Sequence, residues 1–126
     1  MRVAMLALAL TLAISGPVAA GPFEDGLAAL ERGDKALAVQ WFRKAADQGD
    51  ASAQLYLGVM YANGRGVPKD YTLAYMWANL SAAGTSDAHL RETAQKTRDT
   101  VAAGMTPAQI GEAQRLSREW KPTSGR

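Results

Sequence analysis

The hydrophobic and polar residues after position 20 follow a helical pattern and not a strand pattern. No stretch alternates polar and β-branched residues, and Ala, Leu, Gln, Glu, Lys and Arg dominate between breaks that glycine marks. This composition favours helices. The breaks fall at residues 33–34, 49–50, 63–68, 84–86 and 104–107, and they leave six short segments. The pattern therefore predicts six short helices.

Residues that can cap a helix stand at the start of most of these segments. Their side-chain oxygens can accept from the free amide groups of a first turn. The candidates are Asp34, Asp50, Asp70, Ser86 and Thr106. Thr106 is the clearest, because Pro107 suits the first helical position and Gln109 can complete a capping box. We expect Gly64 or Gly66 to end the third helix in the left-handed conformation.

The chain also repeats itself with a period of 36 residues. Ala38 and Trp41 recur at that displacement as Ala74 and Trp77. A period in the mid-thirties with two helices per unit is typical of an α/α solenoid, in which each helix pair buries its apolar face against the next pair. We expect alanine and glycine to let helix axes come close, while Trp41, Trp77 and Tyr61 fill the wider gaps between layers.

The residues between Ala53 and Gly84 resemble one repeat of the Sel-one-like repeat (SLR) family, which is related to the tetratricopeptide repeats. The matching positions are Ala53, Leu57-Gly58, Tyr61, Gly64, Gly66-Val67, Asp70, Ala74, Trp77 and Ala82. The resemblance implies an all-α fold. We expect a short α/α solenoid of antiparallel helix pairs, tetratricopeptide-like, that ends in a C-terminal capping helix pair.

Two further parts of the chain complete the expected solenoid. Phe23–Gly49 looks like a shorter, tetratricopeptide-type unit whose turn lacks the longer glycine-valine loop. The last two segments depart from the motif but keep a helical stripe of apolar residues, which suits a cap with a polar outer face. Glu92 with Lys96, and Arg115 with Glu119, have the one-turn spacing that such a face uses.

The first twenty residues have the layout of a signal peptide. Met1-Arg2 supplies a positive charge, Val3–Ile14 is an apolar run, and Ser15–Pro17 leads into the small residues of Val18–Ala20. We expect cleavage after Ala20. The alternative is a membrane anchor, but the apolar run is well short of the roughly 20 residues that span a bilayer core. The expected location is periplasmic or secreted, without stable membrane insertion after cleavage.

The remaining chain is long enough for one domain, which we place at residues 21–120, followed by a disordered tail at 121–126. It holds no Cys, so its stability must come from helix packing. The whole sequence carries 14 basic and 12 acidic side chains, and no run of Lys or Arg would track a phosphate backbone. We therefore expect no nucleic-acid partner, and we expect a monomer.

The family resemblance implies a binding scaffold. The first helix of each pair would line a concave surface that holds a peptide or another protein. Within the complete repeat the side chains expected to face that surface are Ser52, Leu55, Tyr56, Val59 and Asn63. The alternative is that Leu55 and Val59 pack against the capping helices, because a short solenoid depends on contacts between neighbours.

Residues that could support catalysis are scarce. His89 is the only histidine, and Glu92 three residues on cannot complete a zinc site with it, because such a site needs three or four ligands. The serines lack a local base or a glycine elbow, and Gly64–Gly66 is explained as a helix-to-helix turn. We expect no catalytic residue, no cofactor and no metal.

Two functional hypotheses follow. The first is a non-catalytic protein-protein interaction module or adaptor in the bacterial periplasm, with a protein or peptide partner. The second is a cell-envelope carbohydrate- or peptidoglycan-associated binding protein or hydrolase. The second depends on exposed aromatic residues, and Tyr71 and Tyr75 are the aromatics expected to be partly exposed. The first is favoured, because no pair of carboxylates and no nucleophile with a base stand together in the sequence.

Overall fold

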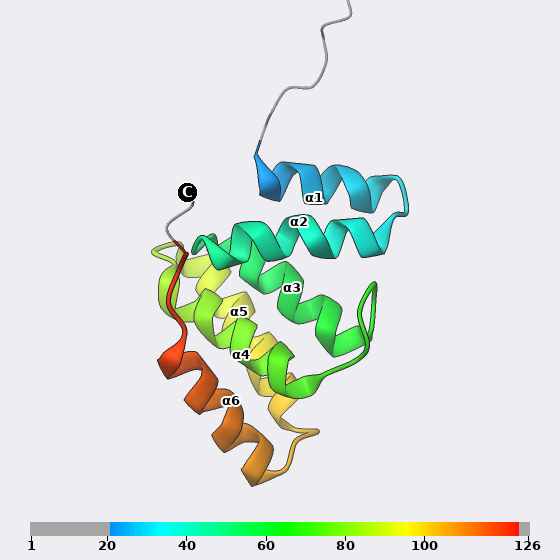
Figure 1. Cartoon of the computed structure of the whole chain (residues 1–126). Coiled ribbons are helices and arrows are strands. Elements are labelled where there is room, and N and C mark those ends of the chain that lie inside the picture. Colours follow the sequence, from blue (N-terminus) through cyan, green and yellow to red (C-terminus); the bar gives the residue numbers. More distant parts are fainter. Residues whose placement is uncertain (1–20, 124–126) are drawn as a thin grey trace, which may run out of the picture.

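The computed structural model describes residues 21–123, which contain six helices and no strand (Figure 1). The expected all-α fold is confirmed. The helices are α1 (Pro22–Glu31), α2 (Lys35–Asp47), α3 (Ala51–Asn63), α4 (Tyr71–Gly84), α5 (Ala88–Ala102) and α6 (Pro107–Glu119). The expected signal peptide, 1–20, and the end of the expected tail, 124–126, lie outside the described residues.

Four of the five predicted helix caps are confirmed, and the fifth is one residue away. Asp34, Asp50 and Asp70 each accept from the amide three residues on, at 3.0–3.1 Å. Thr106 also caps, and both hydrogen bonds of its capping box are present.

Ser86 does not cap α5, and that prediction is wrong. Asp87 is the capping residue, because its carboxylate accepts from the Leu90 amide at 3.0 Å. The Asp87 amide donates to the Thr85 hydroxyl at 3.1 Å, which leaves Ser86 exposed in the turn before the helix. A carboxylate is available one residue later than the hydroxyl, so the helix begins one residue later as well.

The loop after α3 is held by two glycines in the left-handed region. Gly64 ends the helix at φ 65°, as expected, and Gly66 follows at φ 74°. The Asp70 amide donates to the Tyr61 carbonyl oxygen at 3.0 Å, which closes the loop at its far end. A Cβ on Gly66 would lie 2.6 Å from the carbonyl oxygen of Lys35, so the loop touches the start of α2. The loop therefore joins the second helix pair to the first.

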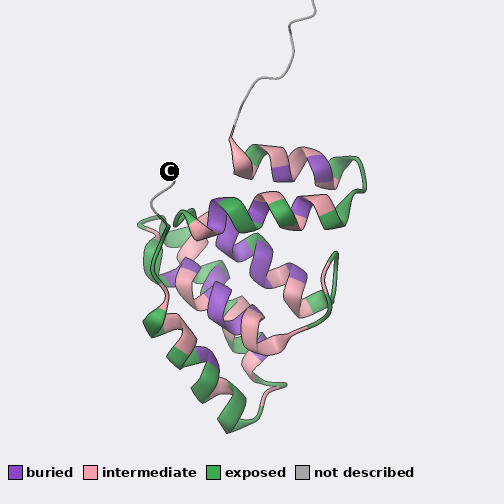
Figure 2. Cartoon of the chain, in the orientation of Figure 1, coloured by how far each residue is buried: buried purple, intermediate pink, exposed green. Residues whose placement is uncertain are grey.

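The core lies mainly along α3 and α4, where buried residues concentrate (Figure 2). Helix α1 packs on α2, α2 on α3, and α3 on α4. Gly58 allows the last of these approaches, since a Cβ there would lie 3.1 Å from the carbonyl oxygen of Ala74. Helices α5 and α6 both pack on α4, so the cap is built around α4.

The two repeat tryptophans differ in burial. Trp77 is 2% exposed and meets the ring of Trp120 edge to face, with centroids 6.3 Å apart. It fills a gap between layers, as predicted. Trp41 is only half-buried, and Lys44 Nζ lies 5.6 Å from its ring centroid. The equivalent sequence position thus has a different environment in the first helix pair.

Pro122 and Thr123, which belong to the expected tail, lie close to the residues at the end of α2. The amide of Thr123 donates to the carbonyl oxygen of Asp47 at 2.7 Å, at the end of α2. A Cβ on Gly49 would lie 3.9 Å from Pro122. Thr123 satisfies a carbonyl group that the end of α2 leaves without a partner in its own helix.

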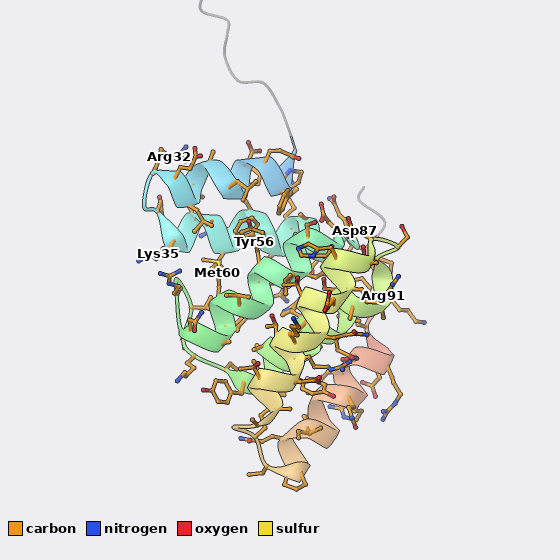
Figure 3. All side chains as sticks on the ribbon, turned by 180° about the vertical axis from the view of Figure 1, so that it is seen from behind. Arg32, Lys35, Tyr56, Met60, Asp87 and Arg91 are labelled. Carbon is orange, nitrogen blue, oxygen red and sulfur yellow. The ribbon has the colours of Figure 1, made fainter. Side chains whose placement is uncertain are left out.

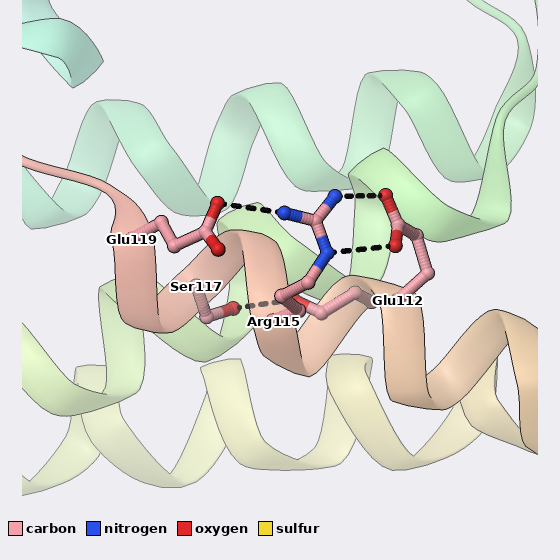
Figure 4. A network of polar contacts seen from close by, with 5 residues as sticks. Glu112, Arg115, Ser117 and Glu119 are labelled. Carbon is pink, nitrogen blue, oxygen red and sulfur yellow. Dashed lines mark hydrogen bonds and ion pairs between the residues drawn. The ribbon is translucent and has the colours of Figure 1, made fainter.

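The exposed surface of the cap carries the expected ion pairs. Lys96 lies 3.7 Å from Glu92, and Arg115 lies 2.7 Å from Glu119. Arg115 also binds both carboxylate oxygens of Glu112, at 3.0 and 2.6 Å (Figure 4). The hydrogen bond from Arg115 lowers the pKa of Glu112 below its ordinary value. The network is exposed and gives α6 a charged outer surface.

Candidate binding site

Three aromatic rings connect the first helix pair to α3. Phe23 of α1, Phe42 of α2 and Tyr56 of α3 are mutual neighbours, with ring centroids 5.0–5.7 Å apart. Phe42 is fully buried, whereas Tyr56 is 40% exposed and is the one exposed large hydrophobic residue in the described chain. Figure 3 shows Tyr56 where α2 and α3 meet. The core therefore supports an aromatic ring that reaches the surface.

A hollow of about 230 Å³, the apolar hollow, opens beside Tyr56. Its wall comes from the end of α1, the start of α2, the middle of α3 and the loop that follows α3. It is lined by Leu30, Lys35, Leu55, Tyr56, Val59, Met60 and Arg65. Figure 3 shows Lys35, Tyr56 and Met60 on this side of the molecule.

A second hollow of about 320 Å³, the polar hollow, lies between α3 and α5. Threonine side chains of α5 form much of its wall. It is lined by Val59, Ala62, Asn63, Thr93, Lys96, Thr97, Thr100 and Val101. Val59 lines both hollows, so the two adjoin on α3. We call the two together the groove.

Four of the five side chains predicted to face a partner line the groove. Leu55 and Tyr56 line the apolar hollow, Asn63 lines the polar hollow, and Val59 lines both. Ser52 lines neither and is half-buried. Helix α3 lines both hollows, α1 and α2 each contribute one residue to the apolar hollow, and α5 contributes five residues to the polar hollow.

The alternative arrangement for Leu55 and Val59 holds at the same time. Leu55 is buried with Ala82 and Ala94, and Val59 packs with Leu90 against this cluster. The cap thus covers one side of these α3 side chains while another side lines the groove. One position can serve both purposes, because a core residue contacts many neighbours.

Sequence reasoning missed four residues of the apolar hollow: Leu30, Lys35, Met60 and Arg65. Leu30 and Lys35 come from the other helix pair, and no periodicity in the sequence links them to α3. Arg65 carried a usable signal. It stands between two glycines in a loop that the first repeat lacks, and the sequence explained this loop only as a turn.

The charges along the groove have one sign. Lys35 and Arg65 stand at the apolar hollow and Lys96 at the polar hollow, and neither hollow is lined by Asp or Glu. Lys96 lies 3.7 Å from the exposed carboxylate of Glu92. Lys35 and Arg65 have no ion-pair partner within residues 21–123. The positive charges without an ion-pair partner therefore lie at the apolar hollow of the groove.

The side chains that the sequence offered as candidates for catalysis do not line the groove. His89 is exposed on α5, and Glu92 pairs with Lys96. Ser81 is buried, and its hydroxyl donates to the Ala51 carbonyl oxygen at 2.7 Å, which ties α4 to the start of α3. Among the described residues there is no group of three or more His, Cys, Asp or Glu that could hold a metal.

The expectation that both Tyr71 and Tyr75 are partly exposed is wrong for Tyr75. Tyr75 is 8% exposed and packs with Val101 of α5 and Ala113 of α6. Its hydroxyl oxygen accepts from Gln114 Nε2 at 3.4 Å. Tyr71 is half-buried, with Lys69 Nζ 5.1 Å from its ring centroid. The two helices of the cap cover Tyr75, which helical spacing within α4 could not reveal.

No helix within residues 21–123 combines the length and the apolar character that crossing a membrane requires.

Comparison with known protein families confirms the expected family. The model of the Sel1 repeat matches twice, at residues 20–50 and 51–86. The first match corrects the reading of Phe23–Gly49 as a tetratricopeptide-type unit, since one repeat model fits both helix pairs. No curated protein matches the sequence.

A solved structure extends the likeness to the fold. It is the crystal structure of a protective antigen present in uropathogenic Escherichia coli strains, which displays an SLR fold. The sequences are 34% identical, and the superposition has a TM-score of 0.68 and covers 79% of this chain. It covers 21% of the antigen, so the chain spans about a fifth of that protein's length.

Proposed function

We propose that the chain, which belongs to the Sel1 repeat family, is a non-catalytic interaction module that holds a segment of a partner protein in the groove of α1, α3 and α5. The Sel1 repeat fold is commonly a protein-interaction module. The occupant of the groove is a peptide-like segment, and the module works in a periplasmic or secreted location.

The apolar hollow beside Tyr56 carries the proposal. Its volume of about 230 Å³ is below the roughly 300–1,000 Å³ of sites that enclose small molecules. Such a hollow suits one or two side chains of a longer ligand. Binding energy at protein interfaces concentrates in a few residues, among which tyrosine is enriched. Tyr56, whose ring centroid lies 5.0 Å from that of Phe42, is an exposed tyrosine of this kind beside the hollow.

The composition of the groove favours binding over catalysis. Neither hollow is lined by Asp, Glu, His, Cys or Ser. General acid–base catalysis and covalent catalysis most often use these groups, and glycoside hydrolysis needs a pair of carboxylates. The carbohydrate-binding alternative depended on a pair of exposed tyrosines, and the burial of Tyr75 removes one of them.

The location is proposed from the first twenty residues. Their charged start, apolar run and small residues up to Ala20 support export and cleavage. Fractionation of cells that express the full chain, with mass spectrometry of the N-terminus, tests this. A chain that begins at Gly21 outside the cytoplasm is expected. A cytoplasmic chain that keeps Met1 would contradict it.

Site-specific crosslinking from position 56 tests the groove. A photoreactive phenylalanine analogue replaces Tyr56 in the full chain in its native envelope, and mass spectrometry identifies what is captured. The matched control carries the same analogue at Arg118, which is exposed on α6 and lines neither hollow. We expect one protein to be captured from position 56 and not from position 118.

Two results would count against the proposal. Capture of glycan fragments in place of protein would favour the envelope-ligand hypothesis. Identical products from positions 56 and 118 would show that the groove is not where the partner binds. With a captured partner in hand, Tyr56→Ala is expected to weaken binding by about 2 kcal/mol, roughly thirtyfold in Kd, as for the loss of an interface anchor.

A further inference from the structure

We infer that the groove selects a partner segment in which an apolar side chain stands next to one or more carboxylates. The inference rests on the proposed function and names the chemistry of its partner. Its basis is the combination of an apolar floor with an unpaired positive edge at the same hollow.

The apolar floor comes from side chains of two helix pairs. Leu30 of α1 lines the apolar hollow together with Leu55, Val59 and Met60 of α3. These side chains form no hydrogen bonds, so an occupant gains most by burying apolar surface against them. Tyr56 adds an exposed ring at the same place. The floor therefore selects for a large apolar side chain.

The positive edge is built by the loop after α3. Gly66 has no side chain, and its backbone lies so close to the Lys35 carbonyl oxygen that a Cβ would be 2.6 Å from it. This contact brings Arg65, the preceding residue, to the start of α2. Figure 3 shows Arg32 and Lys35 together at this end of the α1–α2 pair. Two repeats thus supply the two cations of one site.

Neither cation lies within ion-pair distance of a carboxylate of residues 21–123. The carboxylate of Asp34, next to Lys35, is used to cap α2 through the Leu37 amide at 3.1 Å. It does not line the hollow, and no carboxylate of residues 21–123 forms an ion pair with Lys35 or Arg65. A partner carboxylate would meet an ammonium and a planar guanidinium, and the guanidinium can bind both of its oxygens.

An acidic peptide fits this arrangement better than a polyanion does. A nucleic acid needs a series of cations that follows its backbone. The groove offers two free cations at one end, an apolar floor beside them, and threonines further along. A protein segment can present an apolar side chain and a carboxylate side by side, as this groove requires. Complementary charge at such an interface mainly sets specificity and association rate.

A selection from a peptide library tests the inference without a known partner. Random twelve-residue peptides displayed on phage are selected on purified wild-type protein, expressed from the full chain. The same selection is made on Tyr56→Ala, on the charge reversal Lys35→Glu/Arg65→Glu, and on a control reversal, Arg118→Glu/Lys121→Glu. The control changes net charge by the same amount at exposed residues that line neither hollow. Thermal unfolding checks that each variant folds.

The expected result is a set of peptides with Leu, Phe or Met beside Asp or Glu, on wild type and on the control reversal alike. On Lys35→Glu/Arg65→Glu the preference for Asp and Glu should disappear or turn to Lys and Arg. A selected acidic peptide should bind the groove reversal at least about five- to tenfold more weakly than wild type, as two exposed ion pairs allow. Its affinity should also fall as salt is raised.

Other outcomes separate the two proposals. Apolar peptides that depend on Tyr56 but show no preference for Asp or Glu would overturn this inference and leave the interaction module standing. No enrichment on wild type over Tyr56→Ala would overturn both. A wild-type dimer that the groove reversal dissociates would assign the groove to a second copy of the chain and would overturn the inference as well.

Discussion

The ring of Phe42 on α2 lies directly against the backbone of Gly26 on α1, so that a Cβ at position 26 would be 2.6 Å from Phe42 Cε1. Phe42 is fully buried, and Tyr56 stacks near it with centroids 5.0 Å apart. The close crossing of α1 and α2 thus fixes the ring that supports the exposed tyrosine of the groove. A substitution that moves Phe42 should act on both the core and the groove.

Gly26→Ala is expected to destabilise the protein. Alanine favours a helix by roughly 0.5–1 kcal/mol over glycine, but overpacking a core costs about 1–3 kcal/mol. Phe42 is an inflexible ring without free space, so the overpacking cost should prevail. Urea unfolding followed by tryptophan fluorescence measures the free energy of unfolding.

Gly111→Ala is the matched control for this substitution. Gly111 is exposed on α6, and a Cβ there would meet nothing within 4 Å. The control should gain roughly 0.5–1 kcal/mol of stability from helix propensity alone. Equal effects of the two substitutions would show that Phe42 does not press on Gly26.

Trp77→Ala is expected to cost about 3–5 kcal/mol, the usual loss when an aromatic core residue is removed. Trp120 is half-buried and meets Trp77 edge to face at 6.3 Å, so Trp120→Ala should cost less. A double-mutant cycle of unfolding free energies should give a coupling of about 0.5–1.5 kcal/mol for the ring pair. A coupling of zero would mean that the end of α6 does not close over Trp77 in solution.

Ser86→Ala and Asp87→Ala distinguish the two possible caps of α5. Asp87 accepts from the Leu90 amide and Ser86 is exposed in the turn. At pH 7, Asp87→Ala should lower the urea midpoint, and Ser86→Ala should leave it unchanged. The reverse result would restore the cap that the sequence suggested.

The effect of Asp87 should depend on pH. The hydrogen bond from the Leu90 amide lowers the pKa of Asp87 below its ordinary value of 3.8. A carboxyl with a lower pKa in the folded state stabilises the fold fully above its unfolded pKa, and this contribution is lost as pH falls through the folded pKa. The difference in the free energy of unfolding between wild type and Asp87→Asn should therefore become smaller below about pH 3.8. If this difference instead stays constant at lower pH, the stabilisation by Asp87 comes from hydrogen bonding that does not require its negative charge.

Gly66→Ala should release the loop that brings Arg65 to α2. Both Gly66 and Gly64 have a positive φ, and placing alanine there costs roughly 1–2 kcal/mol. At Gly66 the new Cβ would also lie 2.6 Å from the Lys35 carbonyl oxygen, whereas at Gly64 it would lie 3.4 Å from Lys69 Cβ. Gly66→Ala should thus lose more stability than Gly64→Ala.

Limited trypsin digestion gives an independent measurement of this loop. Cleavage after Arg65 needs the loop to leave the start of α2, so Gly66→Ala should be cut faster than Gly64→Ala at equal temperature. Equal cleavage rates would show that the approach of Gly66 to Lys35 does not hold the loop.

Much of the fold follows from the sequence by itself, because it depends on groups close together in the chain. The helix breaks, the caps at Asp34, Asp50 and Asp70 and the capping box at Thr106 use hydrogen bonds over three residues. The displacement of 36 residues and the motif around Gly58 and Trp77 predicted the repeat family, and the matches at 20–50 and 51–86 confirm it.

The groove was only partly predictable. The exposed side of Tyr56 follows from its position on the first helix of a repeat. Which neighbours complete the hollow does not follow, since Leu30 and Lys35 are supplied by another helix pair and Arg65 by a loop held through Gly66. Contacts of this kind join residues 20 or more positions apart, so a local pattern of hydrophobic and polar residues cannot predict them.

The tertiary structure alone decided which side chains are covered and which are left open. Tyr75 is buried because α5 and α6 both pack on α4, and Thr123 is held because its amide reaches the end of α2. The sequence determined the helices and their order through local hydrogen bonds and apolar spacing. Their packing then determined the groove and its free cations, because burial and charge pairing depend on which surfaces meet in space.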